Sequence, residues 1–375
     1  MDTAPPPLDE ALPAPSFVEE HRFPCTNCGS EFRFDPASGG LQCDHCGNGE
    51  PIEAGDARDA GRELDFHSAQ RGDLSADMIE ETRTASCPNC GAKVEFDPSQ
   101  HAAECPFCAT PVVTDTGTNR HIKPRGVLPF AVAESAGRDA VGKWLGSLWF
   151  APNGVSEYAK KGRKLSGIYV PYWTYDTVTR TAYSGQRGVH YYETRTVMRD
   201  GKQETEQVRK TRWSNTRGRV ARAFDDVLIL ASKALPKRYT DRLGPWDLDA
   251  LQAYEPRYLA GFRAEAYTIG LDDGFENAKQ VMSWQIEQDI RRDIGGDEQR
   301  ITSRDTDYSD ITFKHLLLPV WMAAYKYRGK SYRFVINGRT GAVQGERPYS
   351  AWKIAFAVII AIIVLGVGAF IASEM

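Results

Sequence analysis

The feature that most constrains this chain is a cysteine pattern that occurs twice in its N-terminal third. Each copy has a C-x2-C pair, fourteen intervening residues and a second C-x2-C pair, and the two copies are offset by 62 residues. Phe34-Asp35-Pro36 recurs at the same offset as Phe96-Asp97-Pro98, so the repeat extends beyond the cysteines. The two copies use all eight cysteines of the chain, which are Cys25, Cys28, Cys43, Cys46, Cys87, Cys90, Cys105 and Cys108.

This spacing is typical of a zinc site formed by four thiolates. Two cysteines three residues apart bind one metal from a tight turn, and a following glycine (Gly29, Gly47 or Gly91) eases that turn. Segments as short as 21–49 and 83–114 bury too little apolar surface to fold alone, so metal binding would supply most of their folding free energy. The sequence therefore predicts two zinc ribbons with one zinc ion in each.

Cysteines in this pattern can also bind iron or form disulfides. A rubredoxin-like iron site has similar knuckles, and cysteines form disulfides in oxidising compartments. The N-terminal residues do not resemble a secretory signal, which favours zinc. His45 and His101 are also metal-ligand types, but each set already has four thiolates, and we expect both histidines in solvated loops. A closed all-thiolate site leaves no position for substrate water, so the metals are expected to be structural and not catalytic.

An apolar segment near the C-terminus predicts a single transmembrane helix over residues 352–373. Ile354–Ala372 contains nineteen residues without a charge, which is about 28 Å of helix and close to the thickness of a bilayer core. Trp352 and Lys353 are residue types that anchor a span at the interface. Arg347 and Lys353 lie on the N-terminal side, so the positive-inside rule predicts a tail-anchored protein of the inner membrane with its bulk in the cytoplasm.

Charge is distributed unevenly along the chain. Residues 1–82 carry eighteen Asp and Glu against five Arg, whereas residues 180–222 carry eleven Arg and Lys against four acids. Residues 314–353 carry eight basic residues against one acid, which suggests attraction to anionic lipid headgroups; a solvated basic sheet face is an alternative of similar weight. We expect residues 1–20 to be a disordered acidic tail and residues 50–82 to be a polar linker.

The remaining chain, residues 120–348, predicts one mainly antiparallel α+β body, so the fold class is α+β. Apolar residues recur at helical spacing over Ala133–Leu148 and again after Asp272-Asp273, which we expect to cap the second helix. The second stripe consists of Phe275, Ala278, Met282, Ile286 and Ile290.

Strands are predicted on either side of the second helix. Ile168–Tyr183 is rich in β-branched and aromatic residues, and Arg199-Asp-Gly-Lys202 is a hairpin signal. A second group of strands is expected over His315–Val343, with turns at Arg328-Gly-Lys330 and Asn337-Gly338.

Two segments resemble known phosphate- or calcium-binding motifs but lack residues that those motifs require. Gly137–Lys143 resembles a phosphate-binding loop, but Trp144 stands where Ser or Thr must bind Mg²⁺, and the segment has a helical pattern. Asp305–Asp310 resembles the start of a calcium loop, but Asp310 replaces the required glycine and Leu316 the required glutamate. We therefore predict no ATPase, helicase or hydrolase site, although an unfamiliar active site would have no spacing to recognise.

The chain resembles a bacterial family of tandem zinc-ribbon proteins with a C-terminal membrane tail, over about residues 23–372. Such proteins are described as having zinc ribbons of transcription-factor-IIB type, or as similar to primosomal protein N′ (replication factor Y), a superfamily II helicase. Some resemble the membrane-anchored partner of phage-shock-protein-A-type and flotillin-like proteins in envelope-stress systems. The motifs that carry the resemblance include Leu128-Pro-Phe130, Trp149-Phe-Ala-Pro-Asn153, Pro171-Tyr-Trp173, Phe224-Asp-Asp-Val-Leu228 and Lys314-His-Leu-Leu-Leu-Pro-Val-Trp321.

The resemblance implies zinc at the cysteines and a membrane anchor, and it implies no catalytic residue. The sequence therefore predicts a non-enzymatic zinc-ribbon adaptor on the cytoplasmic face of the membrane that recruits protein partners. The alternative is a nucleic-acid-binding factor in which the ribbons and the basic stretch bind DNA. Tyr191, Tyr192 and Trp213 interleave with that stretch as in proteins that bind single strands, but strand cores have the same composition.

Overall fold

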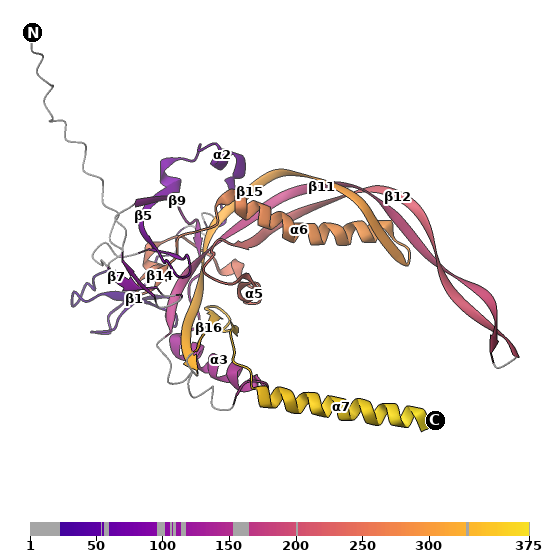
Figure 1. The fold of residues 1–375 in the computed structure, drawn as a ribbon. Helices are drawn as coiled ribbons and strands as arrows, with labels where there is room; N and C mark the ends of the chain where they lie inside the picture. Colours follow the sequence, from indigo (N-terminus) through magenta and orange to yellow (C-terminus); the bar gives the residue numbers. More distant parts are fainter. Residues whose placement is uncertain are drawn as a thin grey trace, which may run out of the picture.

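A computed structural model describes residues 23–53, 55, 60–95, 102–105, 107, 110–113, 118–152, 165–199, 202–327 and 330–374. Three long antiparallel strands form an arch, one long helix, α6, lies under it, and a second long helix, α7, projects from the opposite end of the body (Figure 1). The cysteine-containing segments gather on the body beside the base of the arch (Figure 1). The chain is therefore α+β with mostly antiparallel sheets, as the sequence predicts.

The arch consists of β12 (Lys202–Leu230), β11 (Ser166–Arg199) and β15 (Glu298–Tyr327), in that order. Arg199 pairs with Lys202, which confirms the predicted hairpin. The strands are much longer than the sequence indicates, because β11 has 34 residues and would span up to about 110 Å if extended. Bulges interrupt the pairing of β11 near Asp176 with both neighbours, and they bend the arch.

Helix α6 (Leu271–Ile294) covers the concave face of the arch (Figure 1). All five residues of the predicted stripe are buried there against Trp173 and Tyr175. The helix ends at Gly295, which has a φ of 63°, a backbone conformation that is unfavourable for residues with a side chain. The N-cap of the helix is Gly270, whereas the sequence predicts an aspartate there. Asp272 and Asp273 lie in the first turn, where the helix dipole stabilises a negative charge.

Because α6 packs against the arch, two neighbouring residues of this helix should contribute very differently to the free energy of unfolding. Met282 is fully buried, so Met282→Ala should lower the free energy of unfolding by about 2–5 kcal/mol. Val281 is 42% exposed on the same helix, and Val281→Ala should change it by less than about 0.5 kcal/mol. Urea unfolding of the detergent-solubilised chain measures both values. Equal losses would mean that the helix does not face the sheet in this register.

Shorter elements fill the base of the arch. Helix α3 (Glu134–Ser147) has the predicted extent, and Lys143 is exposed in its interior, so the phosphate-loop imitation is helix. Phe130, Tyr169, Phe262 and Trp321 form an aromatic core beside it. The short elements are β4 (Leu64–Asp65), β10 (Gly126–Val127), α5 (Lys237–Thr240), η2 (Leu248–Ala250), β13 (Gln252–Ala253), η3 (Pro256–Leu259), β14 (Arg263–Ala264), β16 (Lys330–Asn337) and β17 (Val343–Gly345).

Part of the expected linker 50–82 belongs to the body. Strand β4 pairs with β15, and helix α2 (Phe66–Gln70) follows it. Leu64 and Phe66 are buried in the core under the arch, where the Phe66 ring lies 4.9 Å from that of Phe275. Two apolar side chains in a polar segment give little periodicity, so the sequence does not reveal this packing.

The cysteine-containing segments form small antiparallel sheets. The first contains β1 (Phe32–Asp35), β2 (Gly40–Cys43) and β3 (Gly49–Glu50). The second is framed by β5 (Ile79–Ser86) and β9 (Thr118–Ile122), which pair with each other. Between these two strands lie β6 (Lys93–Glu95), β7 (Ala102–Glu104) and β8 (Pro111–Val113), and η1 (Ala76–Met78) directly precedes β5. We call the two units the first module (residues 23–53) and the second module (residues 79–122).

Beyond Gly188, the β11–β12 hairpin leaves the arch. The last residue of β11 that pairs with β15 is Gly188, whereas β11 and β12 remain paired to Arg199 and Lys202. We call Val189–Arg199 together with Lys202–Arg212 the free ribbon. It projects away from the body (Figure 1) over about 35 Å.

Helix α7 (Ala351–Glu374) is the candidate membrane span. Its window Ala351–Gly368 has a mean hydropathy of 2.4 and is not buried against the body. The base of the helix is fixed, because the Ser350 amide donates to Phe150 O at 2.8 Å and Lys353 Nζ donates to Ala151 O at 2.9 Å. The helix is therefore long and apolar enough to cross a bilayer, and it is attached firmly where it leaves the body.

Candidate metal centres

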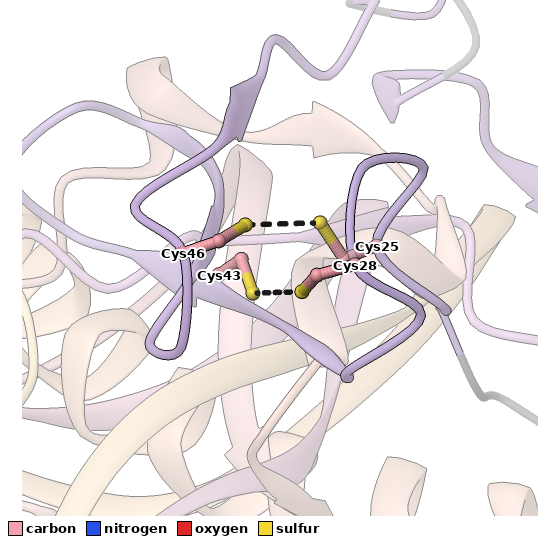
Figure 2. Close-up of side chains that lie close together, drawn as sticks. All are labelled: Cys25, Cys28, Cys43 and Cys46. Atoms are coloured by element: carbon pink, nitrogen blue, oxygen red, sulfur yellow. Dashed lines mark hydrogen bonds between the residues drawn. The ribbon is translucent and has the colours of Figure 1, made fainter.

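The first module brings its four cysteines together (Figure 2). Cys25 Sγ lies 3.6 Å from Cys46 Sγ, and Cys28 Sγ lies 3.6 Å from Cys43 Sγ. All four sulfurs lie within 4.8 Å of one another, although they come from two turns separated by β1 and β2. The cysteine spacing therefore predicted this cluster correctly.

The geometry fits a tetrahedral metal and not disulfides. A tetrahedral ion with metal–sulfur bonds of about 2.3 Å separates its sulfurs by about 3.8 Å. Disulfide sulfurs lie about 2.05 Å apart, and the four cysteines are free. Each turn closes with a glycine amide that donates to the first cysteine's carbonyl, from Gly29 and from Gly47, and both glycines have φ of 73°.

The thiols of the first module differ in how readily they ionise. Burial opposes the ionisation of Cys25, but the amides of Asn27 and Cys28 outweigh it, and the pKa of the Cys25 thiol is lowered. The Cys46 amide lowers the pKa of Cys43, but burial and the adjacent thiols prevail and raise it to about 11. Four adjacent thiolates repel one another, so full ionisation requires a positive ion at their centre.

The second module shows the same arrangement in its described part. Cys87, Cys90 and Cys105 form a cluster, and Cys90 Sγ lies 3.6 Å from Cys105 Sγ. Gly91 repeats the turn, with φ of 73° and its amide 2.9 Å from Cys87 O. Cys108 lies outside the described residues, as do His101 and Phe96-Asp97-Pro98. The two modules thus share their local geometry as well as their spacing.

The remaining predicted residues take no part in the first cluster. His45 is exposed in the turn between Cys43 and Cys46 and does not belong to the group of close ligand atoms, as expected. Four sulfurs already surround the centre of that group, so no coordination position remains for a histidine or for substrate.

A third group of close ligand atoms consists of Glu63, Asp176 and Asp225 at the bend of the arch. The buried ammonium of Lys314 lies 3.1 Å from Glu63 and 2.7 Å from Asp226, so Glu63 belongs to an ion pair. Burial, and then the nearby Glu63, raises the pKa of Asp176 to about 7. These residues come from distant parts of the chain, and no spacing in the sequence reveals them.

One short segment of the body contacts both modules; we call Tyr258–Tyr267 the docking segment. The Phe34 amide of the first module donates to Ala260 O at 2.9 Å, and the Phe34 ring packs on Tyr258. The Ala266 amide donates to Lys93 O of the second module at 3.1 Å. The modules are therefore fixed to the body and are not separate units on linkers.

Comparisons with known proteins identify no activity. No protein-family model matches the chain, and no solved structure matches it. The chain is 26% identical over 336 residues to YdjG of Bacillus subtilis strain 168, described as an uncharacterized protein. The similar region covers 89% of this chain and 92% of that protein. These comparisons name no relative of transcription-factor-IIB or primosomal type, so that resemblance remains an expectation.

Proposed function

We propose that this protein is a non-enzymatic, membrane-anchored scaffold that binds one zinc ion in each module and presents the free ribbon to a protein partner. Zinc is the natural ion for a closed set of four thiolates, and such sites stabilise folds and leave no position for catalysis. Helix α7 holds the body at the bilayer, and the positive-inside rule places that body in the cytoplasm. A reducing compartment also suits free thiolates.

The free ribbon is the observation that carries the scaffold role. An isolated pair of strands is marginally stable in water, and this ribbon has neither a third strand nor a helix over its described residues. Several of its large apolar side chains are exposed, including Tyr192 at 65% and Met198 at 68%. Exposed aromatic residues and methionine are the types enriched where proteins bind one another.

The alternative, DNA binding by the basic stretch, has weaker support. Several of its cations already have partners on the protein: Lys210 pairs with Glu193, and Arg222 forms two bonds to Asp289 of 2.6 and 2.7 Å. Arg212 lies over the Tyr191 ring. Cations with such partners are less available to phosphates, which favours a protein partner.

A crosslinking experiment separates these possibilities. A photoreactive residue in place of Tyr192 should capture a specific protein in living cells, because this side chain is exposed on the free ribbon. The same replacement at Trp284, which is 66% exposed on α6, is the matched control and should capture it at least tenfold less. Equal capture at both sites would contradict the proposal. A Tyr192 adduct that nucleases remove would establish the DNA-binding alternative.

A further inference from the structure

A small cavity lies between the second module and the body. It has about 20 Å³ of water-accessible volume, which is the space that one water molecule needs. Its polar lining comes from both sides: Glu80 and His121 are paired residues of β5 and β9, whereas Glu265 and Tyr267 belong to the docking segment and His315 to β15. The cavity therefore lies at the junction that holds the second module in place.

Three buried atoms in the residues that line this cavity have no hydrogen-bond partner on the protein: His121 Nε2, Glu265 Oε2 and His315 Nε2. Glu265 is 2% exposed and His315 is 4% exposed. Buried polar atoms are almost always paired with protein or with ordered water. Their convergence on one cavity indicates a bound group that satisfies them together.

The hydrogen-bonding roles of Glu265 and His315 fit water, and burial lowers the pKa of His121, so a neutral ring there also has one nitrogen that accepts. His315 Nδ1 lies 2.8 Å from the carbonyl oxygen of Ile122, which only accepts, so Nδ1 carries the proton and Nε2 is an acceptor. Burial lowers the pKa of His315 to about 4, so the ring is neutral. Burial raises the pKa of Glu265 to about 8. Glu265 Oε1 accepts from Ser232 Oγ at 2.7 Å, which leaves a protonated Oε2 as the donor.

We propose that the cavity binds one water molecule and a dissociable proton: the water accepts from Glu265 Oε2–H and donates to the two imidazole Nε2 atoms, and loss of the Glu265 proton loosens the second module. The three protein groups need not lie as close together as the ligands of a metal ion, because one bridging water can bind atoms that are about 5.6 Å apart. The site senses pH within the range that cells experience.

The position of Glu265 explains why the module responds. Its amide donates to Tyr169 O at 3.0 Å, and the next amide, of Ala266, donates to Lys93 O in the second module. An ionised carboxylate would place an uncompensated charge at this junction. The ionisable groups around it in the described part of the chain are Tyr172 of β11, Glu80 of β5, Lys93 of β6, His121 of β9, Tyr254 after β13, Tyr267 of the docking segment and His315 of β15.

The direction of the pH effect follows from the raised pKa of Glu265. A carboxyl that holds its proton more tightly when folded stabilises the junction fully below its unfolded pKa of 4.5, and this stabilisation is lost as pH rises through about 8. At pH 9, opening of the junction should be favoured roughly a hundredfold relative to pH 6, because the stabilisation falls about tenfold per pH unit between pH 6 and the raised pKa of about 8.

Hydrogen exchange of the full-length, metal-loaded chain in detergent tests this proposal. After correction for intrinsic rates, amides of β5 and β9 should lose roughly a hundredfold in protection between pH 6 and pH 9. Glu265→Gln, whose amide donates to the water without titrating, should keep the same protection at both values. Glu276→Gln, on the exposed face of α6, is the control and should behave like the wild type.

Two further results decide the proposal. An unchanged pH dependence in Glu265→Gln would overturn it, and so would a third metal ion per chain that is lost in His315→Ala, because the cavity would then be a metal site. If Glu265→Gln does not fold, infrared spectroscopy of the wild-type chain replaces it. A protonated-carboxyl band that disappears near pH 8 and persists in Asp176→Asn supports the proposal, because the raised pKa of Asp176 would give a second such band; absence of any such band at pH 6 in Asp176→Asn refutes it.

Discussion

Cys105→Ser should remove one metal ion per chain and open the body's core, whereas Cys28→Ser should remove the other ion and leave that core closed. Cys87, Cys105 and Phe107 are buried in one cluster with Leu128 and Ile168 of the body. In the first module, Cys25 and Cys43 instead form a small buried cluster with Phe32 and Leu41, and with Ala260 of the docking segment. Loss of the second site therefore exposes body residues that the first site does not cover.

The effects should be large, because structural zinc contributes on the order of 10–16 kcal/mol to the folding of small zinc modules. Elemental analysis gives the metal count, and hydrogen exchange along β10 and β11 reports the core. Ser86→Ala, next to Cys87 but at a position that binds no metal, should retain both ions. Loss of both ions from either cysteine variant, or equal opening of the body in the two, would contradict the assignment of one ion to each module.

Local patterns were predictable from the sequence. The cysteine cluster of the first module and the buried stripe of α6 follow from spacing within one segment, and the structure contains both. The docking of the modules was not predictable, because it depends on Ala260 and Ala266, which have no distinctive chemistry. The length of the arch and its bulges near Asp176 were not predictable either, because they depend on pairing between distant strands.

The cavity shows the same limit. Residues 121, 265 and 315 are far apart in the chain, and none has a neighbour that signals a site. A histidine or glutamate in an apolar strand is recognised as unusual only when burial is known. The buried ion pair of Lys314 with Glu63 and Asp226 was missed for the same reason, since Glu63 lies in the segment that we expected to be a linker.

Removal of α7 should convert the protein from an integral membrane protein to a soluble one. The side chains of this helix from Ile354 to Val367 are exposed to varying degrees around its surface, as a lipid-facing helix requires, and α7 would be insoluble in water. The full chain should resist carbonate extraction, and the chain ending at Ser350 should be released completely. A reporter after Met375 should be found outside the cytoplasm.

The buried residues of the body's core clusters precede Ser350 in the chain, so the chain that ends at Ser350 should still fold. Salt-sensitive binding of that chain to vesicles with anionic lipids would show that the basic residues 314–353 act through lipid charge. Vesicles of neutral lipid are the control and should bind it weakly. Resistance of the shortened chain to carbonate would mean that α7 is not the anchor.

If each module binds one zinc ion independently of α7, as we propose, the metal content should be the same with and without that helix. Elemental analysis of the full chain extracted from membranes and of the soluble chain ending at Ser350 should give two zinc ions per chain in both samples. Iron in place of zinc, or a single ion per chain in either sample, would contradict the proposed organisation.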